Sequence, residues 1–274
     1  MQIPRFFIQP DQIDENVSAA RIEDAKLVHQ IGRVLRLGVG ARVILLNGDG
    51  SLFHCRIERQ DKGSVHLAIE QKETNPIREY GELTVAMPLI KPARFEWSLE
   101  KLTELGATTI IPIITQRTVQ KPSDGEDGKK KDAKNGNVKK ERWDAIVREA
   151  AEQSERFAIP RVVAPQKFDD YLNEIVRARE TENSTKDLRY IFAERNECPH
   201  LSMHLFKEKE IGGLTKNISL CFGPEGGFTD AELSRAAEVS LTFASLGKLI
   251  LRSETAAVAA AAIVSAMRDL KNIG

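Results

Sequence analysis

One nine-residue stretch constrains the fold of this chain more than any other: Leu-Cys-Phe-Gly-Pro-Glu-Gly-Gly-Phe at 220–228. Its first three residues are apolar and predict the end of a buried strand. Its three glycines allow positive φ and let the backbone approach a ligand closely. Thr229 and Glu232 then form the Thr-x-x-Glu pattern of a capping box, which predicts a helix start. Ligands bind at such strand-to-helix turns in α/β proteins, although one turn of this kind is also common as plain structure.

A second stretch, 246–256, repeats this arrangement one helix and one strand later. It again combines a strand end, a glycine, a short loop and a helix start. The helix that follows is predicted from Ser253 to about Leu270 and is rich in alanine. Arg252 lies at its amino end, where the helix dipole disfavours a cation. A cation at a position that the helix dipole disfavours indicates that its charge serves a function other than stabilising this helix.

Together the two stretches resemble a known family. Gly-Pro-Glu-Gly-Gly-Phe followed by Leu-Gly-x-x-Ile-Leu-Arg-x-Glu-Thr-Ala closely resembles the small-subunit (16S) ribosomal RNA (uracil-N3) methyltransferases of the SPOUT class. The resemblance implies an α/β fold with a SPOUT-type parallel sheet and a C-terminal trefoil knot, preceded by a small PUA-like β-barrel domain. It also implies S-adenosylmethionine (SAM) as cofactor, ribosomal RNA in the small ribosomal subunit as partner, and a homodimer with the active site at the interface. Knots are nearly absent from proteins, so this one rests on the resemblance alone.

Composition places the chain among globular proteins. It has 274 residues, of which 41% are hydrophobic and 29% charged, and no apolar run approaches the length of a membrane span. The start, Met-Gln-Ile-Pro-Arg-Phe-Phe, lacks the regions of a signal peptide, and the three cysteines have no paired spacing. These features predict a cytoplasmic protein. Because the formal net charge is zero, any surface that binds nucleic acid must be a local basic patch.

Residues 1–74 predict a small, mostly β unit with one helix. Strands are expected at residues 5–8, 41–46, 52–58 and 64–70. Asn-Gly-Asp-Gly at 47–50 is a strong signal for a hairpin turn. The helix is expected from about Ile22 to Leu37, with an apolar stripe formed by Val28, Ile31 and Leu35.

The same predicted helix carries a basic stripe of Lys26, His29, Arg33 and Arg36, which recur at three- and four-residue steps. A solvated helix face is the commoner explanation of such a run, whereas the lack of interrupting acids favours phosphate contact. The segments at 4–7 and 29–37 resemble the amino-terminal part of the family, which implies a PUA-like RNA-binding domain. Arg5 joins the stripe as a predicted RNA contact on this basis.

Residues 75–274 predict a methyltransferase domain of alternating strands and helices, after a linker at about 73–82. This rhythm predicts a parallel sheet with helices on both faces. Strands are expected at 83–89, 109–114, 161–163, 188–193, 218–222 and 241–245, and helices at 94–105 and 141–156. Residues 121–140 have almost no apolar side chain, which predicts a mobile loop, with an RNA-contacting arm as the alternative. Arg117, at a strand end, matches an arginine of the family and is a further predicted RNA contact.

Several other classes of site are disfavoured. The chain has no phosphate-binding Gly-x-x-x-x-Gly-Lys-Ser/Thr loop, no Gly-x-Gly-x-x-Gly fingerprint and no Gly-x-Ser-x-Gly elbow. Cys198, His200 and His204 suggest a metal site, but no second cysteine pair or carboxylate follows at usable spacing. We therefore predict no metal, and an irregular segment between a helix and a strand at this point.

The two glycine-bearing loops suit a flat heterocycle held by backbone groups and apolar side chains, which fits the adenosine of SAM. The predicted cofactor-binding residues are Phe192, Ala193, Leu220, Phe222, Gly223, Pro224, Glu225, Gly226, Gly227, Leu246, Gly247, Leu251, Arg252, Thr255 and Ala256. For catalysis we predict that Arg252 either stabilises charge or clamps a phosphate, with Glu254 orienting it. Glu225 is expected either to anchor the glycine loop or to interact with the cofactor.

The leading functional hypothesis is SAM-dependent methylation of uridine N3 in ribosomal RNA. A methyltransferase of the same class that acts on another RNA site, such as a ribose 2′-hydroxyl, is one alternative. A non-catalytic RNA-binding protein that kept the fold is another. Calorimetry with SAM separates the last hypothesis from the first two, and mapping of the modified nucleotide separates those two.

Overall fold

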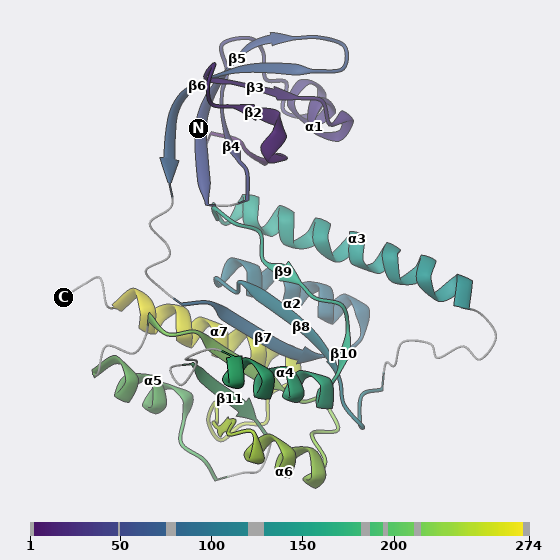
Figure 1. Ribbon diagram of the computed structural model, residues 1–274, viewed down its shortest axis with the longest axis vertical. Coiled ribbons are helices and arrows are strands. Elements are labelled where there is room, and N and C mark those ends of the chain that lie inside the picture. The colour runs from purple at the N-terminus through teal and green to yellow at the C-terminus, as the bar shows by residue number, and fades with distance from the viewer. Residues whose placement is uncertain are drawn as a thin grey trace. The chain divides into compact units, whose positions relative to one another are not determined.

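The computed structural model describes residues 3–48, 50–74, 81–119, 129–181, 187–193, 197–210 and 215–270, with only the backbone at 129–139, 180, 181 and 210. The chain forms two compact units (Figure 1). The first comprises residues 1–78 together with 151–159, and the second comprises residues 79–150 and 160–274. None of the helices in the described part of the chain is long and apolar enough to cross a membrane.

The first unit is built on a six-stranded sheet in the order β1-β4-β5-β6-β3-β2. Its strands are β1 (Arg5–Phe7), β2 (Ile13–Asp14), β3 (Ala19–Ile22), β4 (Arg42–Leu46), β5 (Ser51–Gln60) and β6 (Val65–Thr74). The four strands predicted from the sequence are all present, and β4 and β5 pair as the expected antiparallel hairpin. The pair β2 and β3 was not predicted. A cluster of buried aliphatic and aromatic residues, with Phe6, Leu45 and Phe53 among them, forms the core.

Residues 151–159 complete this unit from a distant part of the sequence. Ala151 is buried against Phe7, Leu46 and their neighbours. The Glu152 carboxylate accepts a hydrogen bond of 3.2 Å from the Phe7 amide, and Glu155 forms an ion pair of 2.6 Å with Arg5. The end of a helix that begins in the second unit therefore belongs to the core of the first, which local patterns do not reveal.

The predicted helix from Ile22 to Leu37 is wrong in extent. Ile22 ends β3, α1 spans only Ala25–His29, and a π-helical turn, η2, follows at Gln30–Val34. The chain then turns out of the helix at Arg36, which has φ of 53°. This turn brings Leu37 against the core and leaves Leu35 exposed, so packing of Leu37 overrides the regular helical spacing.

The second unit contains a parallel sheet in the order β10-β8-β7-β12-β11-β13, with β9 also paired to β8. Its strands are β7 (Leu83–Pro88), β8 (Thr109–Ile114), β9 (Arg161–Val162), β10 (Gln166–Lys167), β11 (Leu188–Phe192), β12 (Ile218–Phe222) and β13 (Thr242–Phe243). All six predicted strands are present, and the prediction of an α/β fold with a parallel sheet is confirmed. The two-residue strand β10 was not predicted.

Helices pack on both faces of this sheet (Figure 1). They are α2 (Pro92–Glu104), α3 (Lys129–Gln153), α4 (Phe168–Thr181), α5 (Leu201–Glu210), α6 (Asp230–Glu238) and α7 (Ser253–Asp269). On one face α7 packs against α2, α5 and the strands β7 and β12, while α4 packs with α6 on the other. Cys221 of β12 belongs to the cluster under α4 and α6. Its neighbours Leu220 and Phe222 therefore point to the opposite face, because side chains alternate along a strand.

Two further predictions about this unit were wrong in part. The loop expected at 121–140 is already helical from Lys129, while residues 120–128 lie outside the described part. The lysines of this stretch are good helix formers, and the helix that follows extends through them in spite of the unfavourable Asn-Gly-Asn run at 135–137. The irregular segment expected around His204 is helix α5 instead, and α4 was not predicted.

Candidate functional site

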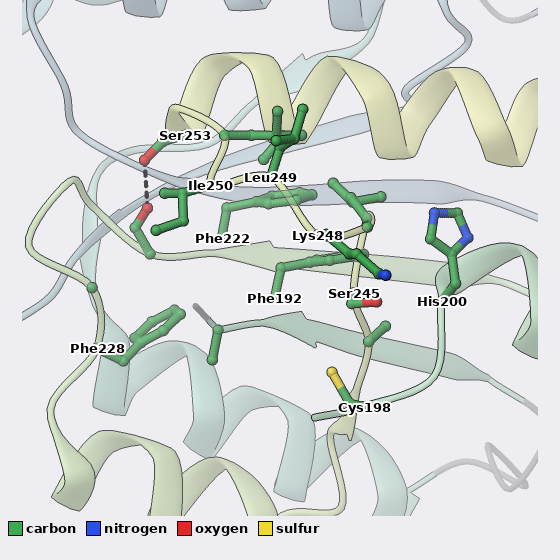
Figure 2. A pocket seen from close by; sticks show the side chains of 18 of the residues that line it. Phe192, Cys198, His200, Phe222, Phe228, Ser245, Lys248, Leu249, Ile250 and Ser253 are labelled. Atoms are coloured by element: carbon green, nitrogen blue, oxygen red, sulfur yellow. Dashed lines mark hydrogen bonds between the residues drawn. The ribbon is translucent and has the colours of Figure 1, made fainter. Parts of the chain in front are cut away.

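A cavity of about 670 Å³ opens at the carboxyl ends of β11, β12 and β13 (Figure 2). Its wall is formed by residues that follow these strands, by the loop at 246–251 and by the first turn of α7. Function concentrates at this edge of an open α/β sheet because loops there are free to vary while the strands hold them in place. In the structure the two glycine-bearing stretches therefore meet at one cavity.

Two stacked phenylalanine rings form an apolar part of the cavity wall. Phe192 and Phe222 are the last residues of β11 and β12, and they are register partners in the parallel pair. Their side chains therefore point the same way, and the rings stack with centroids 4.6 Å apart and planes 6° apart. Both rings line the cavity (Figure 2). Such a surface suits a planar heterocycle.

The glycine turn after β12 is shaped by close contacts at two positions. A Cβ on Gly223 would lie 3.0 Å from the Phe228 ring, which packs in the core beside Phe168. A Cβ on Gly226 would lie 3.2 Å from the Arg117 side chain. Gly227 has no close contact at its Cβ position, and what sets it apart is its backbone: φ is 67°, and its amide donates to the Pro224 carbonyl at 2.8 Å. Larger residues at these positions would deform the turn.

The helix after this turn starts as predicted. The Thr229 hydroxyl accepts from the Glu232 amide at 3.3 Å, and the Glu232 carboxylate accepts from the Thr229 amide at 2.8 Å. The capping box is therefore confirmed. The other oxygen of this buried carboxylate accepts from the Gln116 amide at 2.9 Å, which ties the turn to the end of β8.

Ser253 fastens the two loops together. Its hydroxyl, in the first residue of α7, donates to the Gly223 carbonyl at 2.6 Å (Figure 2). Ser253 is almost fully buried, whereas Gly223 is partly exposed at the cavity wall. The sequence pointed to the arginine before it and the glutamate after it, and missed this serine. An unexplained hydroxyl at the first position of a helix was the available signal.

We expect Ser253→Ala to lower the free energy of unfolding by about 1–2 kcal/mol, because it leaves the Gly223 carbonyl without its buried donor. Amide hydrogen exchange in the loop at 246–251 should accelerate. Ser98→Ala is the matched control, since this buried hydroxyl donates to the Arg94 carbonyl within α2. It should leave exchange in the loop unchanged. Equal loop protection in wild type and Ser253→Ala would contradict a fastening role.

Most of the predicted cofactor residues gather at the cavity. Those that line it are Phe192, Ala193, Phe222, Gly223, Pro224, Gly227, Leu246, Gly247, Leu251 and Ala256. The predicted residues outside the wall are Leu220, Glu225, Gly226, Arg252 and Thr255. Leu220 is buried in the core, and Arg252 and Thr255 are exposed near the start of α7.

The sequence missed other parts of the wall. The missed residues are Glu197, Cys198, His200, Phe228, Ala244, Ser245, Lys248, Leu249, Ile250 and Ser253. Leu249 and Ile250 lie inside a predicted loop, so continuity along the chain was a usable signal. The segment at 197–200 had none. It reaches the cavity because the Ser245 amide donates to the Pro199 carbonyl at 3.0 Å and the Leu201 amide donates to Ser245 at 2.9 Å.

The predicted pairing of Glu254 with Arg252 is wrong. Glu254 is buried, and its Oε1 lies 3.5 Å from Nε of Arg94 at the start of α2. Nη1 of the same arginine lies 3.4 Å from Oε1 of Glu225. Arg252 is the N-cap of α7 and makes no side-chain cap hydrogen bond, and its side chain is exposed. No ion pair of Arg252 is found among the described residues.

The predicted RNA contacts fall into two groups. Lys26, His29, Arg33 and Arg36 are exposed, although the π-helical turn and the bend at Arg36 mean that they do not follow one helix face. Arg5 is instead paired with Glu155, and only 16% of its side chain is exposed. Arg117 donates to the Gly226 and Phe228 carbonyls at 2.9 and 3.1 Å, so it braces the glycine turn.

The polar residues near Cys198 have other partners. Nδ1 of His200 lies 2.8 Å from the Ser202 hydroxyl, and the His204 ring packs beside Tyr190. Burial lowers the pKa of His204 and raises the pKa of the Cys198 thiol, which favours the neutral form of both. Within the described ranges, no group of three potential ligands is arranged to hold a metal ion.

A parallel α/β domain with a cavity at its strand ends belongs to the broad class of proteins that bind a small-molecule ligand or cofactor at this edge of the sheet. Comparison with family models narrows this class. Residues 78–265 match an RNA methyltransferase domain, and residues 22–70 match an RNA methyltransferase PUA domain. The chain therefore belongs to the RNA methyltransferase family, and the resemblance identified from the two loop motifs is confirmed.

Individual relatives agree with this assignment. The chain is 34% identical to a protein of Synechocystis named ribosomal RNA small subunit methyltransferase E, over 97% of this chain and 78% of the relative. It is 32% identical to the Bacillus subtilis protein of the same name, over 89% of this chain and 88% of that protein. A Legionella pneumophila protein, solved in complex with SAM as its bound cofactor, is 25% identical with a TM-score of 0.76, over 97% of this chain and 98% of that one.

Proposed function

We propose that this protein transfers a methyl group from SAM to N3 of uridine in small-subunit (16S) ribosomal RNA. The observation that carries the proposal is the cavity at the strand ends, enclosed by two loops that Ser253 holds together. The named relatives support ribosomal RNA as the substrate, and the Legionella structure supports SAM as the cofactor. The N3 position follows from the resemblance of the two loop motifs.

The chemistry of the wall fits SAM. This cofactor combines a flat adenine with a zwitterionic amino acid. The wall offers the stacked rings of Phe192 and Phe222 for the first, and side chains of both signs, Lys248 and Glu197, for the second. Backbone groups of the glycine turn add hydrogen-bonding partners without bulk. A ligand of this size also suits the volume of about 670 Å³.

Positioning and electrostatics should dominate the chemistry. When bound, SAM supplies an electrophilic methyl group whose sulfur leaves as a neutral thioether. At the uracil, loss of the N3–H proton leaves negative charge spread over N3 and the two carbonyl oxygens. Arg252 is our candidate to stabilise this charge, since its guanidinium is exposed beside the start of α7 and has no described ion-pair partner. Glu225 and Glu254 complete the proposed site, with Glu225 in the glycine turn and Glu254 held by Arg94.

The surface around α1 and η2 is our candidate for RNA binding. Lys26, His29, Arg33 and Arg36 are exposed there, and no ion pair of Arg33 or Arg36 is found in the described part of the chain. Uncompensated cations are well suited to phosphate groups, because they release condensed counterions when they bind. Arg5 and Arg117, which already have protein partners, are weaker candidates for direct contact.

We expect Arg33→Ala combined with Arg36→Asn to weaken RNA binding and to flatten its dependence on salt by about one unit of slope per lost contact. Asparagine is chosen at position 36 because it tolerates the positive φ found there. Binding is measured by filter retention across a salt series, and SAM affinity should barely change.

Arg42→Ala combined with Arg59→Ala is the matched control for this pair. It removes the same charge from the same unit, but both arginines already pair with acids, Glu70 and Asp61. RNA affinity should therefore change little. If the Arg33 and Arg36 variant keeps wild-type affinity and salt slope, the basic residues form only a solvated surface.

The architecture that the family implies completes the proposal. We propose a PUA-like barrel for residues 1–74 and a SPOUT domain for residues 75–274, with the chain near α7 forming a trefoil knot. The separate family matches and the two compact units support this division. Residues 151–159 are a further segment of the first unit. We also propose a cytoplasmic homodimer with the active site at its interface.

The test is methyl transfer from labelled SAM to small ribosomal subunits that lack the modification, followed by nucleoside analysis. The expected product is 3-methyluridine. A 2′-O-methylated nucleoside would move the protein to another site on RNA. Calorimetry that detects no SAM binding would instead indicate a protein that kept the fold without the reaction.

A further inference from the structure

Arg94 contacts both the glycine turn after β12 and the first turn of α7, and neither it nor its two partners, Glu225 and Glu254, line the cavity. It is the third residue of α2, where the helix dipole disfavours a cation, so local preference does not explain its charge. Its Nη1 lies 3.4 Å from Oε1 of Glu225, which belongs to the glycine turn after β12. Its Nε lies 3.5 Å from Oε1 of Glu254, in the first turn of α7. One guanidinium therefore joins two segments that are about thirty residues apart in the sequence.

The two contacts differ in strength. The Glu254 side chain is only 9% exposed, and its Oε2 has no hydrogen-bond partner among the described residues. A buried carboxylate depends heavily on its cation, because removing the cation leaves an uncompensated buried charge. The Glu225 side chain is 44% exposed, so water screens that pair. Arg94 is thus held firmly by α7 and more loosely by the turn.

We infer that Arg94 is a positioning residue for methyl transfer, an inference that rests on the proposed function. By holding Glu254 it fixes the first turn of α7, which begins directly after Arg252. By reaching Glu225 it sets the position of the glycine turn relative to that helix. Ser253 makes a second link between the same two segments on the cavity side. The sequence did not single out Arg94, because its two partners lie far away in the chain.

The test compares Arg94→Ala with wild type in single-turnover methylation at saturating SAM, in SAM calorimetry and in thermal melting. We expect the methylation rate to fall between about tenfold and a hundredfold, since small misplacements of reacting groups have effects of this size. SAM affinity should fall less, by about fivefold or below. Arg94→Lys should recover part of the rate, because a lysine keeps the charge but cannot contact both carboxylates as a planar fork.

Arg94→Ala combined with Glu254→Gln separates positioning from stability when it is compared with Glu254→Gln alone. The second change removes the buried charge, so it should restore melting, while the methylation rate stays below that of Glu254→Gln alone. Lys101→Ala is the matched control on α2, because the ion pairs of Lys101 among the described residues are with Glu100 and Glu104 of the same helix. It should methylate at the wild-type rate.

Two outcomes would overturn the inference. A folded Arg94→Ala variant with the wild-type rate would remove any role in the reaction. Recovery of melting in the double variant, together with the rate of Glu254→Gln alone, would show that Arg94 only neutralises a buried carboxylate. A wild-type protein that neither binds SAM nor methylates RNA would instead refute the proposed function, and the inference with it.

Discussion

Replacing Gly227 by valine is expected to raise the dissociation constant for SAM roughly a hundredfold or more while most of the fold survives. Gly227 lines the cavity and has φ of 67°, a conformation that a β-branched residue strongly disfavours. A Cβ there would meet nothing within 4 Å, so the effect comes from backbone strain and not from a clash. Strain of about 1–3 kcal/mol is relieved if the turn rearranges, and binding must then restore the native turn. That cost corresponds to about fivefold to 150-fold in affinity, and the branched side chain beside the ligand adds to it.

Gly106→Val is the matched control for this prediction. Gly106 follows α2, has φ of 90°, and also has open space where its Cβ would lie. The two variants should therefore lose similar stability in thermal melting. Only Gly227→Val should lose SAM binding in calorimetry. A folded Gly227→Val protein with wild-type SAM affinity would mean that the conformation of the glycine turn does not matter to the cofactor.

Arg252→Ala is expected to lower the single-turnover rate of methyl transfer by roughly a hundredfold or more, the range seen for loss of one preorganised donor. The reason is that Arg252 would act on charge that develops on the uracil, so its effect is larger in the transition state than in the bound state. SAM affinity should fall far less. Arg252→Lys should also be impaired, because it keeps the charge but loses the planar fork. The measurement is transfer of labelled methyl to ribosomal subunits.

Thermal melting distinguishes this role from a structural one. The Arg252 side chain is exposed at the N-cap of α7, where a cation opposes the helix dipole, so its removal should leave stability unchanged or slightly higher. Arg235→Ala is the control, since Arg235 is another arginine near a helix end and pairs with Glu238 on its own helix. An Arg252→Ala protein that melts much earlier yet methylates normally would show that the arginine serves the fold alone.

Local patterns were enough to predict most of the strands and the edge of the sheet where the cavity lies. A strand buried on both faces is a continuous apolar run, as at Thr109–Ile114, and needs little context to identify. The glycine turn and the capping box at Thr229 are also local, because both depend on residues within four positions. The resemblance of the two loop motifs then pointed to the family, which the family models confirm.

Predictions failed where packing overrode local spacing. The helix expected at 22–37 breaks because Leu37 packs into the core in place of Leu35. The helix α3 begins at Lys129, earlier than expected, because the polar composition of this stretch predicts a loop although its lysines favour helix.

The sequence by itself determined the parallel sheet, the two glycine-bearing loops and the chemistry expected between them, because each depends on a short run of residues. Only the tertiary structure decided how charged groups pair around the site. In the structure Glu254 pairs with Arg94 and not with Arg252. Arg117 donates a hydrogen bond to the glycine turn, and Arg5 pairs with Glu155. These partners are between 109 and 160 residues apart in the sequence. Ion pairs depend on distances of a few ångströms in space, and spacing along the chain carries no information about contacts of such long range.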